Sequence, residues 1–398
     1  MNILQVHNRY IQTGGEWSVL NQEKDLLDME HQVDQYIVEN KSELNSYWKK
    51  ARLLFSTHKS KKYSDIVARQ LQAGNHDLMH VHNFFPLLTP SVFESARQLG
   101  VPSVLSLHNF RLIHPNGLLY HYGKIDERSV KGSAWKCVKD GVYRDSVIQT
   151  AVVAHMIEYH RKHGTWQKYP SAFIALSEFS KSKFVEGGLP EERIFVKPNF
   201  IEDPLKQYPD LDIDKPKENF YLYAGRISGE KGINELLKYW TKQNTGKKLV
   251  IAGNGPLKRK LQKRTSGQPN VKWIGHVEKK TILELMASAR AMIFPTKCYE
   301  NFPITILEAM SVGCPVVTSN IGNPAKIINH EKTGFHFELD NPADLTNQLK
   351  KLENRDIAKS LSRMARKTYL EKYTPKQNYK ILMEIYKCAA EFEKQVKA

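Results

Sequence analysis

Short apolar runs alternate with longer amphipathic segments along most of the chain. The amphipathic segments predict helices, among them Trp17–Met29, Ile233–Tyr239, Lys279–Ser288 and Ile304–Ser311. Strands are predicted at Ile3–His7, Val33–Val38, Leu78–His82, Val101–Leu107 and Ala172–Leu176, and then at Phe220–Ala224, Leu249–Ala252, Val271–Ile274, Ala291–Phe294 and Val316–Thr318. Strand–helix alternation at this spacing is typical of βαβ units. We therefore predict an α/β protein with one parallel sheet in each half, covered by helices on both faces.

The chain of 398 residues is longer than the roughly 250–300 residues that one hydrophobic core usually holds. Residues 202–219 combine three prolines with many charges and little apolar content, which is typical of a linker. We therefore predict a first domain at 1–201, a second at 202–374 and a charged helix at 375–398 that returns to the first domain. Ligands of open parallel sheets bind beyond the carboxyl ends of the strands, so we expect a cleft there.

The amino-acid composition limits the classes to which the protein can belong. The formal charge of +17 predicts an anionic partner, which is a nucleic acid, a membrane or a small molecule. No apolar run approaches the roughly 18 residues that span a bilayer, and the first residues do not resemble a signal peptide. The four cysteines form no CxxC pair, which excludes a disulfide scaffold and favours a reducing cytoplasm.

The segment Tyr299–Met310 follows a predicted strand and carries the most specific group of candidate residues. Pro303 is placed to begin a helix, so Glu300 falls in the loop before it and Glu308 inside it. Two carboxylates can then accept hydrogen bonds from ligand hydroxyls. The amides of Asn301 and Phe302 lie near the helix start, where an anion is favoured. The alternative is a solvated helix with ordinary surface glutamates.

Glycine-containing loops follow the first predicted strand of each half. After Phe220–Ala224, the segment Gly225–Gly232 brings Arg226 and Lys231 to the carboxyl end of the strand, which suits a diphosphate. In the first half, the pair Gly14 and Gly15 permits a close approach of the backbone to a ligand. The run that begins at Gly253 lacks the third glycine of a dinucleotide fingerprint, so a dehydrogenase is disfavoured.

Histidines and aspartates suggest metal sites that we do not favour. His80 and His82 share one face of a strand, and we interpret them as a polar lining of the cleft. His108, at the end of the next strand, is the better functional candidate. The acidic run Asp210–Asp214 lies in the linker and is interpreted as solvated charge. We therefore predict no metal site.

The segment Tyr47–Lys62 contains six cations and no acid, with aromatic and leucine residues between the cations. This pattern predicts either an amphipathic segment on an anionic membrane or a basic surface helix that packs on its own domain. No nucleic-acid recognition module is visible, so nucleic acid is not expected as a partner.

Together these residues resemble the retaining glycosyltransferases of family 4 (glycosyl transferases group 1), which have the GT-B fold of two Rossmann-like domains around a central cleft. The resemblance covers nearly the whole chain. Its motifs occur in the family's order, and the two glutamates are separated by seven residues: Gly14-Gly15, His80-x-His82, His108, Lys197-Pro198-Asn199, Gly225-Arg226, Lys231-Gly232, Gly253-x-Gly255, Glu300 and Glu308.

The resemblance implies an acceptor-binding first domain and a donor-binding second domain. Arg226 and Lys231 would hold the donor diphosphate, Glu308 the ribose and Glu300 the donor sugar, while His108 would lie near the anomeric carbon. These roles make His108, Arg226, Lys231 and Glu300 the candidate catalytic residues. The remaining donor-binding candidates are Gly14, Gly15, Asn199, Gly225, Gly253, Asn301 and Phe302.

Similar family members often carry several cysteines around residues 125–146. Here Asp126 and Ser129 stand where two cysteines are expected, and only Cys137 remains. This departure argues against a metal or disulfide role for the segment.

The resemblance implies transfer of a hexose from a UDP- or GDP-sugar to a hydroxyl of a glycan or lipid-linked acceptor. We expect a metal-independent enzyme of polysaccharide biosynthesis, cytoplasmic or peripheral on the inner face of the cell membrane, that uses no cofactor beyond its nucleotide-sugar co-substrate. Same-face attack is favoured, and a covalent path through Glu300 stays open. The alternatives are a GT-B nucleotide-sugar epimerase and a non-catalytic basic protein that binds lipid or nucleic acid.

Overall fold

The computed structural model describes residues 1–10, 15–40, 56–242 and 246–397, and these residues form two compact units. Unit 1 comprises residues 1–119, 126–199 and 378–398, and unit 2 comprises residues 120–125 and 200–377. The main division falls after Asn199, close to the predicted boundary at residue 201. The sequence did not predict that residues 120–125, a short antiparallel hairpin, belong to unit 2.

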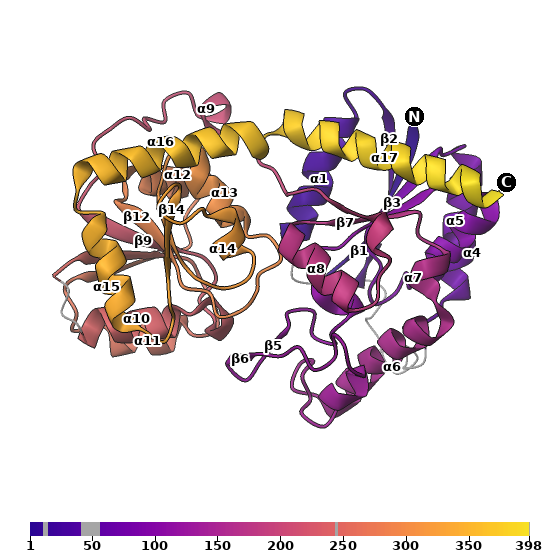
Figure 1. The fold of residues 1–398 in the computed structure, drawn as a ribbon, viewed down its shortest axis with the longest axis horizontal. Coiled ribbons are helices and arrows are strands. Elements are labelled where there is room, and N and C mark those ends of the chain that lie inside the picture. Colours follow the sequence, from indigo (N-terminus) through magenta and orange to yellow (C-terminus); the bar gives the residue numbers. More distant parts are fainter. Residues whose placement is uncertain (11–14, 41–55, 243–245, 398) are drawn as a thin grey trace. The chain divides into compact units, whose positions relative to one another are not determined.

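Unit 1 is built on a parallel six-stranded sheet of order β2-β1-β3-β4-β7-β8 (Figure 1). All five strands predicted for the first half are present, and the sixth, β8, was not predicted. It is an edge strand of only three residues. The strands are β1 (Asn2–Arg9), β2 (Gln32–Glu39), β3 (Leu78–Asn83), β4 (Ser103–Ser106), β7 (Ala172–Ala175) and β8 (Ile194–Val196).

Unit 2 repeats this architecture with the order β11-β10-β9-β12-β13-β14, again all parallel. The predicted α/β architecture with two parallel sheets is therefore confirmed, although the edge strand β14 was also missed. The strands are β9 (Phe220–Ala224), β10 (Lys248–Ala252), β11 (Val271–Gly275), β12 (Ala291–Phe294), β13 (Val316–Ser319) and β14 (Gly334–Phe337).

Helices cover both faces of each sheet (Figure 1). In unit 1 they are α1 (Gly15–Leu27), α4 (Lys61–Ala73), α5 (Ser91–Leu99), α6 (Val147–His163), α7 (Thr165–Lys168) and α8 (Glu178–Glu186). Unit 2 contains α9 (Pro204–Gln207), α10 (Ile233–Lys242), α11 (Lys258–Arg264), α12 (Lys279–Ser288), α13 (Ile304–Ser311), α14 (Pro324–Ile327), α15 (Pro342–Lys351) and α16 (Arg355–Lys372). The short elements are β5 (Tyr120–His121), β6 (Lys124–Ile125) and the 3₁₀ turns η1 (Phe110–Leu112), η2 (Ala134–Cys137), η3 (Glu191–Arg193) and η4 (Gly229–Lys231).

The last helix, α17 (Pro375–Lys397), contributes to the core of unit 1 from residue 378 onward. Its apolar face, which includes Leu382, Ile385 and Ala389, packs against Ile3 and Val104 of the sheet. The helix therefore completes unit 1, although it follows unit 2 in the chain.

The predicted linker is structured rather than loose. Asp203 caps α9 and forms a two-point ion pair with Arg366 of α16, at 2.9 and 2.7 Å. The Ile201 amide donates to the Tyr373 carbonyl at 3.2 Å. The proline-rich composition therefore marks the division but not a flexible connection.

A fully buried ion pair joins three elements of unit 1. The Lys197 ammonium, just after β8, contacts the Glu23 carboxylate of α1 and donates a hydrogen bond to the Asn378 side-chain oxygen of α17 at 3.2 Å. Both charged side chains are 1% exposed. Because water does not reach them, each charge depends on the other for its stability.

Replacing Lys197 by Met leaves a buried carboxylate without its cation. We expect Lys197→Met to lower the free energy of unfolding of unit 1 by about 3–5 kcal/mol in calorimetry. The control is Lys59→Met, because Lys59 pairs with Glu94 on the surface of the same unit and such pairs contribute about 1 kcal/mol or less. Equal effects of the two substitutions would contradict this account.

Candidate functional site

The main candidate site lies in unit 2, on the loops that follow β9 and β12. These strands are neighbours in a parallel sheet, so their carboxyl ends meet at one edge. The two loops are joined by a hydrogen bond from the Lys297 amide to the Glu230 carbonyl at 2.8 Å. The topology therefore brings the segments that contain Lys231 and Glu300 together, although they are far apart in the sequence.

Lys231 and Glu300 form the central contact of this site. The Lys231 ammonium lies 2.5 Å from Glu300 Oε1, and the Thr296 hydroxyl donates to the same oxygen at 3.2 Å. The side chains are 27% and 12% exposed, so the pair is shielded but remains reachable from solvent. Burial lowers the pKa of Lys231, while Glu300 and, to a smaller extent, Cys298 and Glu230 raise it, and the net shift is upward. Lys231 is therefore a cation at neutral pH.

The backbone of the Glu300 loop is held by Asn323, a residue that the sequence analysis missed. Glu300 adopts a φ of 44°, a conformation that is costly for a residue with a side chain. The buried Asn323 side chain donates to the carbonyls of Glu300 and Asn301 at 2.6 and 2.5 Å. These bonds fix the loop in this conformation. The available signal was a polar Gly-Asn-Pro turn just after the buried strand β13.

The other donor-site candidates lie on the same loops or on neighbouring helices of unit 2. Glu308 lies in α13, is 15% exposed and pairs with Lys279 of α12. The Arg226 side chain is exposed, while its carbonyl accepts a hydrogen bond from the Tyr223 hydroxyl at 2.8 Å. Phe302 is nearly buried and packs edge-to-face on Tyr373.

Gly225 and Gly253 pack their loops against each other. A Cβ at Gly253 would lie 1.9 Å from the Gly225 carbonyl oxygen, so no larger residue fits at that position. The Gly225 amide also donates to the Ala252 carbonyl at 3.1 Å. Gly253 therefore has a packing role, whatever it contributes to a ligand.

The candidates in unit 1 centre on His108, which follows β4. His82 Nδ1 and His108 Nε2 are 3.1 Å apart, and Glu23 Oε2 lies 3.5 Å from His82 Nε2. The carboxylate favours a proton on His82 Nε2, which makes His82 Nδ1 an acceptor for the His108 Nε2 proton. His108 Nδ1 is then an unprotonated acceptor.

The structure describes some of the remaining residues predicted for unit 1 and leaves others outside its described ranges. Gly15 begins α1, and a Cβ there would meet nothing within 4 Å. Asn199 is buried at the end of unit 1, and Gly14 lies outside the described residues. Of the basic segment Tyr47–Lys62, residues 47–55 lie outside the described residues, and Lys61 and Lys62 are exposed at the start of α4. No helix in the described ranges is long and apolar enough to cross a membrane.

Within the described part of the chain, two buried groups have the side chains of a metal site: Glu23, His80 and His82, and His114, Asp126 and Cys137. In the first group the Lys197 ammonium already neutralises Glu23. His80 is also engaged by the Tyr386 and Ser106 hydroxyls, at 2.8 and 2.9 Å. This arrangement disfavours a metal there, and His80 is fully buried in unit 1.

The second unit matches a known family. Residues 212–371 match the family described as glycosyl transferases group 1. Among curated proteins, the D-rhamnosyltransferase WbpZ of Pseudomonas aeruginosa is 31% identical over 166 residues, which are 40% of this chain and 43% of WbpZ. The lipopolysaccharide 1,6-galactosyltransferase of Salmonella typhimurium is 28% identical over 191 residues, 46% of this chain and 52% of that protein. The chain spans about half the length of the curated relatives it matches.

Solved structures match nearly the whole chain. Anabaena Alr3699/HepE in complex with UDP aligns with a TM-score of 0.67 and 17% identity, over 96% of this chain and 99% of that one. The lipopolysaccharide outer core galactosyltransferase WaaB, in its apo form, aligns with a TM-score of 0.64 and 16% identity, over 97% and 99%. The protein has the GT-B fold, as predicted, and residues 212–371 of its second unit match the family of glycosyl transferases group 1.

The histidines of unit 1 predict a pH dependence of stability. Burial lowers the pKa of His108 to about 4 and that of His7 to about 3, below the ordinary value of 6.5. The unfolded chain therefore binds more protons below pH 6.5, and the stability of unit 1 falls as the pH is lowered from 6.5 toward 4. The slope is about 1.4 kcal/mol per pH unit for each such histidine.

Calorimetry from pH 8 to pH 5 measures this slope, and His108→Gln removes the His108 contribution to it. Nitrogen-15 NMR at pH 7 is expected to show neutral His108 with its proton on Nε2. A His108 titration near pH 6.5 would contradict both the burial argument and the proton assignment.

Proposed function

We propose that the protein is a retaining glycosyltransferase that moves a hexose from a nucleoside diphosphate sugar to a hydroxyl of a glycan or lipid-linked acceptor. The observation that carries this proposal is the Lys231–Glu300 pair on the carboxyl edge of the second sheet. The family match over residues 212–371 supports it, as do the UDP bound to Alr3699/HepE and the glycosyltransferase activities named for the matched proteins.

In this proposal unit 2 binds the donor. Lys231 and the exposed Arg226 hold the diphosphate, the amides of Asn301 and Phe302 support it at the start of α13, and Glu308 binds the ribose hydroxyls. Two cations supply the charge that a metal ion gives other enzymes, so the transfer is metal-independent. Glu300 binds hydroxyls of the donor sugar and keeps the buried Lys231 charged until the diphosphate arrives.

The bond between the anomeric carbon and the diphosphate breaks, and the acceptor oxygen forms a new bond to that carbon on the same face. Negative charge that develops on the leaving diphosphate is stabilised by Arg226, Lys231 and the amides. The acceptor proton passes to an oxygen of the leaving diphosphate. His108 is proposed to serve as a neutral hydrogen-bond partner of the substrate, since its lowered pKa keeps it unprotonated at neutral pH.

The matched lipopolysaccharide galactosyltransferase and rhamnosyltransferase favour an acceptor from cell-surface polysaccharide biosynthesis. A thermal-shift screen of UDP- and GDP-sugars identifies the donor, because a ligand that binds the folded state raises the melting temperature. Product analysis with the bound donor and lipid-linked glycans then tests transfer. If no nucleoside diphosphate sugar binds, the proposal fails.

Removing either diphosphate cation is expected to weaken UDP binding strongly. Arg226→Ala and Lys231→Ala should each raise the dissociation constant of UDP by about 10- to 100-fold, since hydrogen bonds to charged groups contribute about 1.5–3 kcal/mol. Calorimetric titration measures the effect. The matched control is Lys238→Ala, an exposed lysine of α10, which should leave the affinity unchanged. Unchanged UDP affinity in both variants would exclude this donor site.

Glu300→Gln separates the two roles of Glu300. UDP, which has no sugar, should still bind at pH 7, whereas transfer should be lost because the donor sugar loses its carboxylate partner. Without the Glu300 carboxylate, burial is opposed only by the weaker effects of Cys298 and Glu230, so the pKa of Lys231 falls. We therefore expect UDP affinity of the variant to decline between pH 7 and pH 10 while that of the natural protein declines less. Identical pH profiles would refute the coupling.

A further inference from the structure

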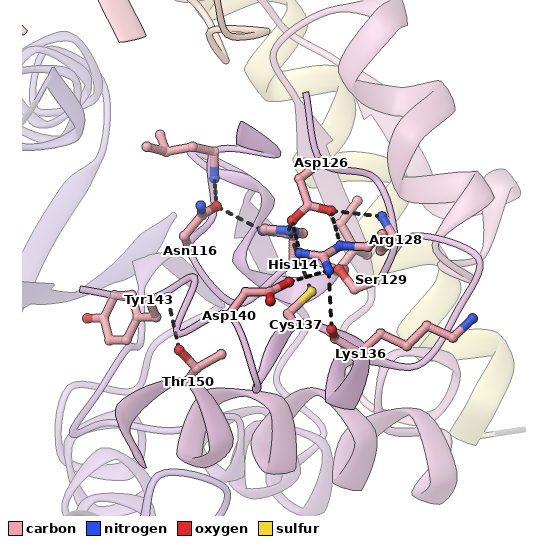
Figure 2. Close-up of polar contacts among 12 residues, drawn as sticks. His114, Asn116, Asp126, Arg128, Ser129, Lys136, Cys137, Asp140, Tyr143 and Thr150 are labelled. Atoms are coloured by element: carbon pink, nitrogen blue, oxygen red, sulfur yellow. Dashed lines mark hydrogen bonds and ion pairs between the residues drawn. The ribbon is translucent and has the colours of Figure 1, made fainter. Parts of the chain in front are cut away.

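The buried group His114, Asp126 and Cys137 is independent of the proposed donor site. All three residues belong to unit 1 and lie in the segment between β4 and α6. His114 and Cys137 are fully buried, and Asp126 is 7% exposed. Figure 2 shows their side chains pointing toward one another. The ligand atoms lie within 4.8 Å of one another.

The spacing of the three atoms fits one small cation. His114 Nε2 lies 3.5 Å from Asp126 Oδ2 and 3.8 Å from Cys137 Sγ. Around a tetrahedral zinc ion, the bond lengths for nitrogen, oxygen and sulfur ligands place such atoms about 3.3–3.6 Å apart. The Asp126 oxygen and the Cys137 sulfur lie within 4.8 Å of each other, so zinc binding requires the cluster to contract.

The proton on His114 is fixed on the nitrogen that faces away from the cluster. The Leu118 amide, which can only donate, lies 2.9 Å from Asn116 Oδ1 and so identifies this atom as the oxygen. His114 Nδ1 lies 2.8 Å from the same oxygen and must donate to it (Figure 2). In its neutral form His114 therefore directs an unprotonated Nε2 at Asp126 and Cys137. This is the tautomer that a metal-binding histidine needs, with the kind of second hydrogen bond that orients such ligands.

The surrounding charges balance a divalent ion. Arg128 binds both oxygens of Asp126, at 2.9 and 2.8 Å, and also binds Asp140 at 2.5 Å. Asp140 therefore offsets the charge of Arg128. The Asp126 carboxylate and a Cys137 thiolate then offset the two charges of the ion. Among the described residues, Lys197 of the other buried group pairs with Glu23 alone, so its positive charge is not offset by a second carboxylate.

We propose that His114, Asp126 and Cys137 bind a zinc ion, with a water as the fourth ligand, which reverses the prediction from the sequence that this segment has no metal role. One sulfur, one nitrogen and one oxygen ligand favour Zn²⁺ over Mg²⁺ or Ca²⁺. Binding forms a zinc–sulfur bond and releases the thiol proton of Cys137 to solvent. The ion would tie the loop at His114 to the segments at Asp126 and Cys137. The ion would restrict the motion of the segment that follows His108 and would not be part of the donor site.

The experiment uses full-length, untagged protein stripped with a chelator and titrated with Zn²⁺ or Co²⁺. We expect about one Zn²⁺ per chain, a higher melting temperature with Zn²⁺, and a thiolate-to-cobalt absorption band with Co²⁺. Cys137→Ser should abolish the band, and the control Cys388→Ser, at a partly exposed cysteine of α17, should keep it. No bound Zn²⁺ in the natural protein, or a cobalt band that survives in Cys137→Ser, would overturn the proposal.

A second variant covers the case in which Cys137→Ser does not fold. Asn116→Ala keeps all three ligands but frees the His114 ring. It should weaken Zn²⁺ binding about 10- to 100-fold, a range typical for loss of such outer partners. An unchanged affinity would contradict the assignment of the His114 proton. Failure of UDP binding leaves these results unaffected, so the two proposals are tested separately.

Discussion

A lysine held against a glutamate at the carboxyl edge of a parallel sheet is the interaction on which the candidate donor site depends. Lys231 and Glu300 meet because β9 and β12 are neighbours, so the loops after them share one edge. Shielding from water would make either charge costly alone, and the pair removes that cost. Asn323 fixes the loop that carries Glu300. The close packing of Gly225 and Gly253 fixes the start of the loop that carries Lys231.

Unit 1 also contains a pair of opposite charges that is shielded from water, but this pair is fully buried. Its buried charges, Glu23 and Lys197, join α1 to the end of β8, and the carboxylate also orders the protons of His82 and His108. The neutral histidines that result suit hydrogen bonding more than proton transfer at neutral pH. If the proposed function holds, the chemistry therefore relies on the cations of unit 2.

The sequence predicted ten of the twelve strands in the two large sheets because their apolar runs are long enough to stand out. It missed β8 and β14, which are edge strands, and it did not predict the ion pair of Asp203 with Arg366 in the linker segment. Lys231 and Glu300 were predictable from the strand ends. Asn323 and the partnership of His114 with Asp126 and Cys137 were not, because both depend on contacts between distant turns.

A crystal structure of the protein with UDP tests the central claim most directly. The account predicts that the diphosphate lies within hydrogen-bond distance of the Lys231 ammonium and the Arg226 guanidinium, with the ribose hydroxyls on Glu308. UDP bound with its phosphates away from Lys231, or on unit 1 alone, would contradict the assignment of unit 2 as the donor-binding unit.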